Sequence, residues 1–185
     1  MKDATTQQFQ RRENEQEIIS YIAALMDGEG HISIGKNKLS KNYRYRFQLY
    51  FSNTDTRLVD YFTDFCTNND IHFYIRKRIK QKKSYLDQYE VSVVGIEHAK
   101  HFLDLIYPKL IGNKKEYAGI VLKFLESRIN RKINFKAERN EKGQYLHGHS
   151  PEYTGYEEQL YTQYKELRDP QRLHAMPLPS SLRKG

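Results

Sequence analysis

Hydrophobic side chains recur along the chain at two different spacings, and the spacing changes from segment to segment. Apolar positions three and four residues apart predict helices over 15–26, 55–68, 96–106, 114–129 and 156–168. Apolar and polar positions that alternate predict strands over 31–36, 43–52, 72–80 and 88–94. Up to residue 129 the order is therefore helix, two strands, helix, two strands and two helices.

This order predicts an α+β fold in which an antiparallel sheet carries helices on one face. The strand over 43–52 illustrates the pattern, because its side chains sort cleanly between two faces. One face has Tyr43, Tyr45, Phe47, Leu49 and Phe51, and the other has Arg44, Arg46, Gln48 and Tyr50. We expect the first face to pack against the helices and the second to stay open.

The open face has two interpretations. It is either the ordinary solvated face of a half-buried sheet or a surface that contacts nucleic acid. The chain has a formal net charge of +8, and six basic residues fall between Arg76 and Lys83. Such a balance favours a polyanionic partner, and a two-stranded ribbon fits the major groove of DNA. The candidate DNA contacts are Lys36, Lys38, Arg44, Arg46, Gln48, Arg76, Arg78, Lys80 and Lys82.

The 185 residues are enough for one domain with a core and a small appendage. We divide the chain into a flexible N-terminal segment (1–15), a core domain (16–130) and a loop-rich C-terminal extension with a short helix (131–185). No run of 18 apolar residues predicts a membrane span, and the first twenty residues lack the apolar stretch of a secretory signal. The single cysteine, Cys66, excludes a disulfide framework and Cys-rich zinc sites.

Candidate chemistry lies where the first helix meets the first strand. Asp27 and Glu29 alternate there with Gly28 and Gly30, directly after an uncharged helical turn. The pattern suits a tight turn with exposed acids. It also suits a Mg²⁺ site, because carboxylates and a free glycine carbonyl are hard oxygen ligands. Mg²⁺ held between a carboxylate and a phosphate supports the cleavage of phosphodiesters.

The whole stretch Ile22-Ala23-Ala24-Leu25-Met26-Asp27-Gly28-Glu29-Gly30 strongly resembles the name-giving motif of the LAGLIDADG homing endonucleases. The flanking Tyr21 and His31-Ile32-Ser33-Ile34 also resemble the family, and the order of elements matches its α-β-β-α-β-β-α core with a saddle-shaped sheet. The resemblance covers about residues 17–127. Glu29 stands where the motif has its second Asp, so the carboxylate is kept on a longer side chain.

This resemblance implies roles for the motif residues. The motif helices of two copies would pack together, with the dimer contact formed by Ile22, Ala23, Ala24 and Met26. Glu29 would bind a divalent metal with help from the Gly28 carbonyl, and Asp27 would support the site. A chain with one motif is expected to form a homodimer with two active sites at its two-fold axis.

Two further catalytic candidates rest on the same resemblance. Asp55 follows the second strand, where family members often hold a polar residue near the metal-bound water; a plain helix N-cap is the alternative. Lys114 begins a later helix and would stabilise developing charge, with Lys115 or a solvated helix start as alternatives.

The sequence therefore predicts a site-specific DNA endonuclease that makes metal-dependent double-strand breaks at a long, pseudo-palindromic target. Its cofactor would be Mg²⁺, with Mn²⁺ or Ca²⁺ as substitutes for binding, and its partners double-stranded DNA and a second copy of itself. The alternatives are an intron RNA maturase and a catalytically inactive DNA-binding protein of the same fold. We expect an intracellular location, in an organelle (mitochondrion or chloroplast) or a bacterial or phage cytoplasm.

Overall fold

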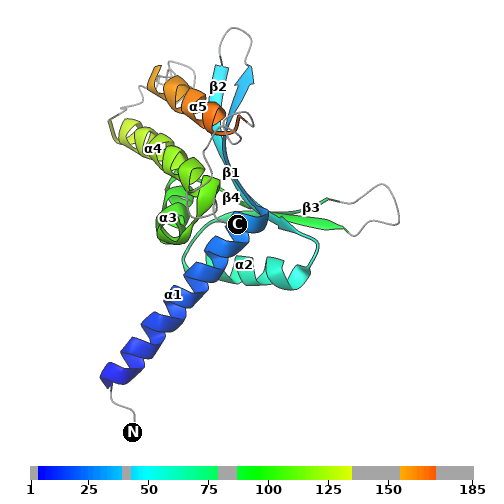
Figure 1. The fold of residues 1–185 in the computed structure, drawn as a ribbon, viewed down its shortest axis with the longest axis vertical. Helices are drawn as coiled ribbons and strands as arrows, with labels where there is room; N and C mark the ends of the chain where they lie inside the picture. Colours follow the sequence, from blue (N-terminus) through cyan, green and yellow to red (C-terminus); the bar gives the residue numbers. More distant parts are fainter. Residues whose placement is uncertain (1–3, 39–42, 79–86, 135–154, 170–185) are drawn as a thin grey trace, which may run out of the picture.

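Four antiparallel strands form one sheet, and helices pack against one of its faces (Figure 1). The structure is a computed structural model that describes residues 4–38, 43–78, 87–134 and 155–169. The elements are α1 (Ala4–Glu29), β1 (Gly30–Lys38), β2 (Tyr43–Asn53), α2 (Thr56–Asn68), β3 (Phe73–Arg78), β4 (Gln88–Val93), α3 (Ile96–Ile106), the 3-10 helix η1 (Tyr107–Lys109), α4 (Gly112–Asn134) and α5 (Gly155–Leu167). The expected α+β architecture is confirmed.

The sheet consists of two strand pairs joined by a short contact. β1 pairs with β2 along its whole length, from Gly30 opposite Phe51 to Lys38 opposite Tyr43. β2 pairs with β4 over Tyr50–Asn53 alone, while β4 pairs with β3 throughout. The order β1-β2-β4-β3 leaves β1 and β3 at the edges. Because the central contact is short, the pairs diverge from it, and Figure 1 shows β1 and β2 rising away from β3.

Alternation along β2 divides the sheet into a buried and an open face. Tyr45, Leu49 and Phe51 are buried, whereas Arg46 and Gln48, which alternate with them, are exposed. The predicted division is confirmed for these residues, while Tyr43 at the start of the strand is exposed. An aromatic column starts from the buried face. The Phe51 ring stacks on Phe62 of α2 at 5.0 Å, and Phe62 contacts Phe102 of α3 at 5.5 Å. Each fully buried ring of this kind contributes about 1.5–3 kcal/mol.

Helix α1 is longer than the hydrophobic pattern predicts. It begins at Ala4 rather than near Glu15, so the expected flexible segment is largely helical. The added turns are rich in Gln, Arg and Glu, which are good helix formers but give no apolar stripe that periodicity could detect. The helix also continues past Met26 to Glu29, and β1 follows at Gly30 with no loop between them.

Helix α5, in the C-terminal extension, packs on the core rather than standing apart from it. Its buried side chains are Glu157, Leu160 and Tyr164. Tyr161 of α5 lies with its ring centroid 5.4 Å from that of Tyr45 in β2, and Tyr164 meets Tyr117 of α4 edge to face at 5.5 Å. Within the described residues, no helix is long and apolar enough to cross a membrane.

Candidate functional site

The two motif acids lie in the last turn of α1 and have different surroundings. Glu29 is exposed, and its carboxylate has no hydrogen bond or ion pair with any described residue. Asp27 is partly buried, and its Oδ2 accepts a hydrogen bond from the backbone N–H of Ile111 at 2.9 Å. Its other oxygen, Oδ1, is buried with no hydrogen-bond partner among the described residues. A buried, unsatisfied carboxylate oxygen is costly and invites a cation or a donor.

Lys114 contacts the backbone of the helical turn that carries these acids. Its Nζ donates to the backbone carbonyls of Met26 at 2.8 Å and Gly28 at 3.3 Å. These carbonyls lie at the helix end, where no intrahelical donor is available. Burial lowers the pKa of Lys114, and the nearby Asp27 and Glu29 oppose that shift. The Lys115 ammonium instead lies 5.7 Å from the Tyr107 ring centroid, so of the two candidate lysines it is Lys114 that contacts the end of α1.

The residues at the end of α1 partly fit a divalent metal. The exposed Glu29 carboxylate and the unsatisfied Oδ1 of Asp27 are hard oxygen ligands. The Gly28 carbonyl already accepts from Lys114, which leaves it one further lone pair. No three His, Cys, Asp or Glu side chains gather to hold a metal in the described part of the chain. A metal here would therefore need further oxygens from a phosphate, water or a second chain.

Asp55 lies at the N-cap of α2, as the alternative interpretation expected. Its Oδ1 accepts from the backbone N–H and the Nε of Arg57, both at 3.0 Å, and its Oδ2 accepts from Nη2 at 2.6 Å. The side-chain bond to Arg57 holds the pKa of Asp55 below its ordinary value. Among the described residues, no hydrogen bond or ion pair joins Asp55 to Asp27, Glu29 or Lys114. Its catalytic role stays a prediction.

A polar chain that the sequence did not predict begins beside the acids, on the open face of the sheet. Ser33 donates its hydroxyl proton to Oε1 of Gln48 at 3.1 Å, so its oxygen accepts from Nε2 of His31 at 2.8 Å. The His31 ring stacks on Tyr50 at 4.5 Å. Burial lowers the pKa of His31, and the cations Arg168 and Lys114 add to that shift. A neutral His31 and a fixed Gln48 amide thus line the face next to Glu29.

Five of the predicted DNA contacts share the open face. Paired residues of neighbouring antiparallel strands lie on the same face of the sheet. Arg76 pairs with Glu90 of β4, which in turn pairs with Ser52 on the open face of β2. The members on this face are Arg44, Arg46, Gln48, Arg76 and Arg78. All five are exposed, although Arg78 also forms an ion pair with Glu90. Lys80 and Lys82 lie outside the described residues.

The assignment of Lys36 and Lys38 to this face is corrected by the register. Lys36 lies opposite Tyr45, and Lys38 opposite Tyr43, so both belong to the face that carries the helices. The Lys36 ammonium forms a 3.1 Å ion pair with Glu158 of α5 and lies 4.2 Å from the Tyr43 ring centroid. The two lysines were chosen for their charge, whereas the alternation of β1, which continues to Lys38, decides the face.

The predicted dimer contact is also corrected for three of its four residues. Ile22, Ala23 and Met26 are fully buried in the core of the chain itself, so their side chains cannot meet a second copy. Ala24 is exposed. The exposed side of α1 instead carries Ile18 and Tyr21, which are 41% and 45% exposed.

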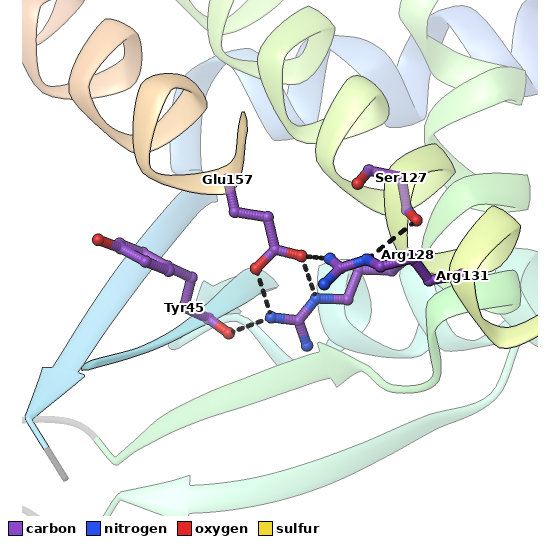
Figure 2. Close-up of polar contacts among 5 residues, drawn as sticks. All are labelled: Tyr45, Ser127, Arg128, Arg131 and Glu157. Carbon is purple, nitrogen blue, oxygen red and sulfur yellow. Dashed lines mark hydrogen bonds and ion pairs between the residues drawn. The ribbon is translucent and has the colours of Figure 1, made fainter. Parts of the chain in front are cut away.

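A buried ion cluster holds α5 to α4, and nothing in the sequence pattern pointed to it. The Glu157 side chain is fully buried between the guanidinium groups of Arg128 and Arg131 (Figure 2). Arg128 donates to both Glu157 oxygens at 2.9 Å and to the Tyr45 carbonyl of β2 at 2.8 Å. In the sequence, Glu157 resembles any exposed acid of an amphipathic helix.

Comparisons with known proteins agree with this architecture. The profile of the LAGLIDADG-like domain matches residues 16–107. Curated protein sequences gave no match. Among solved structures, the chain is similar to the homing endonuclease I-CvuI in complex with its target, at a TM-score of 0.52 and 21% identity over 64% of this chain and 72% of that one.

Two further solved structures share more of the chain. The archaeal intron-encoded homing endonuclease I-Vdi141I, complexed with DNA, has a TM-score of 0.55 at 11% identity and covers 82% of this chain and 84% of its own. The homing endonuclease I-TnaI has a TM-score of 0.50 at 14% identity, over 81% and 97%. At these identities the likeness establishes a shared fold.

Proposed function

This chain belongs to the LAGLIDADG homing endonuclease family, and we propose that it is a DNA endonuclease that cleaves both strands of a specific site with the help of a divalent metal. The single observation that carries the proposal is the constellation at the end of α1. There an exposed carboxylate, Glu29, and a buried unsatisfied oxygen, Asp27 Oδ1, lie beside the ammonium of Lys114. Two carboxylates that can bind a metal, next to an ammonium group and to a sheet face rich in arginine, suit phosphodiester cleavage.

Each residue of the constellation has a distinct task in this proposal. Glu29 and Asp27 would hold the metal, which when bound neutralises phosphate charge and activates water. Lys114 would stabilise charge that develops on the cleaved phosphate, because its ammonium is fixed by two backbone carbonyls. The neutral His31 next to the site accepts a proton more readily than an imidazolium would. Structures of I-CvuI with Ca or Mg are consistent with divalent metal use in the family.

The DNA would lie against the open face of the sheet. Arg44, Arg46, Arg76 and Arg78 would supply phosphate and guanine contacts, and Gln48 would read a base edge. The Gln48 oxygen accepts from Ser33, which orients the amide and leaves its N–H groups and one lone pair to contact a base edge.

We further propose that two copies pair through the exposed side of α1. Ile18, Tyr21, Ala24 and Gly28 recur at three- and four-residue spacing and are all exposed. Gly28 has no heavy atom within 4 Å of where a Cβ would stand, which leaves room for the helix of a partner. Pairing along this line would bring two sets of acids together and supply the further ligands that one chain lacks.

Cleavage of a plasmid library of intron-junction and randomised sites tests the proposal. The wild type, Glu29→Gln and the matched control Glu17→Gln, an exposed acid three turns earlier on α1, would each be incubated with Mg²⁺ or with EDTA. We expect specific double-strand breaks with Mg²⁺ from the wild type and the control, and none from Glu29→Gln or in EDTA.

Other outcomes would indicate a different function or a different metal site. Tight DNA binding without cleavage in Mg²⁺ or Mn²⁺ would indicate an inactive DNA-binding protein. Preferential binding of intron RNA would indicate a maturase. Equal cleavage by Glu29→Gln would remove Glu29 from the metal site. Sedimentation of the wild type beside Ala24→Arg would test the pairing surface, because a buried, unpaired charge in the helix contact should leave only monomers.

A further inference from the structure

The end of α5 lies one helical turn from Lys114. Lys114 and Tyr117 are three residues apart on α4 and therefore lie on the same side of that helix. Lys114 reaches the last turn of α1, and the Tyr117 hydroxyl donates to the carbonyl of Leu167, the last residue of α5, at 3.5 Å. Helix α4 thus brings the ends of α1 and α5 to neighbouring positions, although residues 29 and 167 are far apart in the sequence.

Arg168 follows directly and is held in place by its own helix. Its Nη1 donates to the Tyr164 hydroxyl at 3.2 Å, and its guanidinium carbon lies 5.8 Å from the Tyr164 ring centroid. Tyr164 is itself 2% exposed and packs edge to face on Tyr117. The anchor is therefore rigid, whereas Arg168 is exposed and forms no ion pair with a described carboxylate.

Three other basic side chains that contact α5 differ in this respect. Glu157 neutralises Arg128 and Arg131, and Glu158 pairs with Lys36. These three cations hold α5 to the core and have little charge to offer a ligand. Of the arginines at α5 in the described chain, Arg168 has no carboxylate partner, and apart from one bond from Nη1 to Tyr164 its donors stay available. The planar donor fork of a guanidinium matches the oxygens of a phosphate better than an ammonium does.

We propose that Arg168 binds a backbone phosphate of the DNA beside the bond that is cut, so that the C-terminal extension completes the nuclease site. The inference rests on the proposed function, since it requires that DNA lies on the open face. It adds a residue outside the domain profile, which ends at residue 107. Arg168 makes and breaks no bond in this role; it positions the phosphate and attracts it electrostatically.

The test compares single-charge variants in the full-length protein. DNA binding would be measured in Ca²⁺ over a series of salt concentrations, and cleavage in Mg²⁺, for wild type, Arg168→Ala, Arg168→Lys and Lys123→Ala. Lys123 is an exposed cation on α4, about two and a half turns from Lys114 and so on the opposite side of the helix. It controls for the loss of one positive charge anywhere on the surface.

We expect Arg168→Ala to bind about tenfold more weakly, with the slope of log K against log salt reduced by about 0.9 in magnitude, the value for one phosphate contact. Arg168→Lys should restore the slope and part of the affinity. Tyr164→Phe, which keeps the packing but frees the guanidinium, should lose affinity without changing the slope. Lys123→Ala should match wild type. Thermal melts of all variants identify any that are unfolded.

Three results would overturn the inference. Arg168→Ala could retain the affinity and salt slope of the wild type. Lys123→Ala could lose as much as Arg168→Ala, which would show a general effect of charge. Failure of the wild type to bind any DNA would instead overturn the proposed function and this inference with it. If Arg168→Ala does not fold, wild-type affinity in Tyr164→Phe would overturn the inference, because the anchor that holds the guanidinium would then not matter for binding.

Discussion

The two strand pairs of the sheet are built alike but supported differently. β1 and β2 are braced from the helix side by α5, whose Glu157 and Glu158 engage Arg128, Arg131 and Lys36. β3 has no such brace: every residue from Tyr74 to Arg78 is exposed, and among the described elements the strand pairs only with β4. One sheet thus combines a braced arm, β1 and β2, whose helix-side cation Lys36 holds α5, with an open arm, β3 and β4, whose cations are exposed.

The difference separates stability from binding within a single basic chain. On the helix side of the braced arm, removing a charge breaks a contact with α5, and the free energy of unfolding should fall. On the open arm, Arg76 forms no ion pair with a described residue, so removing it should affect a ligand more than the fold. A count of basic residues cannot distinguish these roles, whereas strand register and burial do.

The largest expected effect is the loss of Glu157 from the braced arm. Glu157→Ala leaves two guanidinium groups facing one another without a counter-charge and should lower the free energy of unfolding by about 3–5 kcal/mol. Glu90→Ala on the other arm removes one partner of the half-exposed Arg78 and should lower it by only about 1–2 kcal/mol. Urea denaturation followed by circular dichroism measures both. Equal losses would contradict the contrast between the arms.

Apolar truncations should show the same contrast on a slightly smaller scale. Leu49 of β2 is 2% exposed, and Leu49→Ala should lower the free energy of unfolding by about 2–4 kcal/mol. Ile75 of β3 is 51% exposed, so Ile75→Ala should lower it by less than about 1 kcal/mol. Thermal and chemical denaturation of the two variants provide the comparison. A large loss in Ile75→Ala would mean that something covers β3.

Loss of an exposed arginine on β3 and loss of a lysine that contacts α5 should have different effects. Arg76→Ala should leave the melting temperature unchanged and lower DNA affinity, reducing the magnitude of the salt slope by about 0.9. Lys36→Ala should loosen α5, lower the melting temperature by a few degrees and leave the salt slope as it is. Fluorescence anisotropy at several salt concentrations, beside melts, separates the two results. A changed slope in Lys36→Ala would return Lys36 to the DNA surface.

The smallest expected effect concerns pH. Burial, helped by Arg168 and Lys114, lowers the pKa of His31 below its value in the unfolded chain, which is about 6.5. As the pH falls below 6.5, the unfolded state therefore binds more protons at this position, and the free energy of unfolding decreases until the folded pKa is passed. His31→Gln should flatten that part of the profile. Denaturation curves between pH 5 and 8 test it, and an unchanged profile would contradict the burial of a neutral His31.

The sequence predicted most of the elements because periodicity reports burial. The helix Ile96–Ile106 appears with the bounds expected, and the clean alternation of β2 places Tyr45, Leu49 and Phe51 in the core. The motif also led to Glu29 and Lys114, which the fold brings to the same helix end. What periodicity cannot report is a helix without an apolar stripe, which is why the first turns of α1 were missed.

Long-range pairing is the other gap. Nothing local to Glu157 distinguishes a fully buried carboxylate from an exposed one, since its partners lie 26 and 29 residues earlier on a different helix. Lys36 was counted with the DNA contacts for its charge, although it alternates in phase with Ile32 and Ile34 and so faces the helices. Ile22, Ala23 and Met26 were assigned to a dimer contact from the motif alone, while the exposed side of the same helix becomes visible only once the core is formed.

The junction between α1 and β1 has a mechanical consequence. Glu29 ends the helix, Gly30 starts the strand, and a Cβ at Gly30 would stand 2.6 Å from Met26 Sδ, so the corner is too tight to hinge. If two copies meet along α1, the crossing angle of that contact is transmitted directly to the strands. β1 is roughly 30 Å long, so a tilt of about 10° would shift its far end by about 5 Å, more than the 3.4 Å between successive base pairs. The geometry of the helix contact would then determine the distance between the two half-sites.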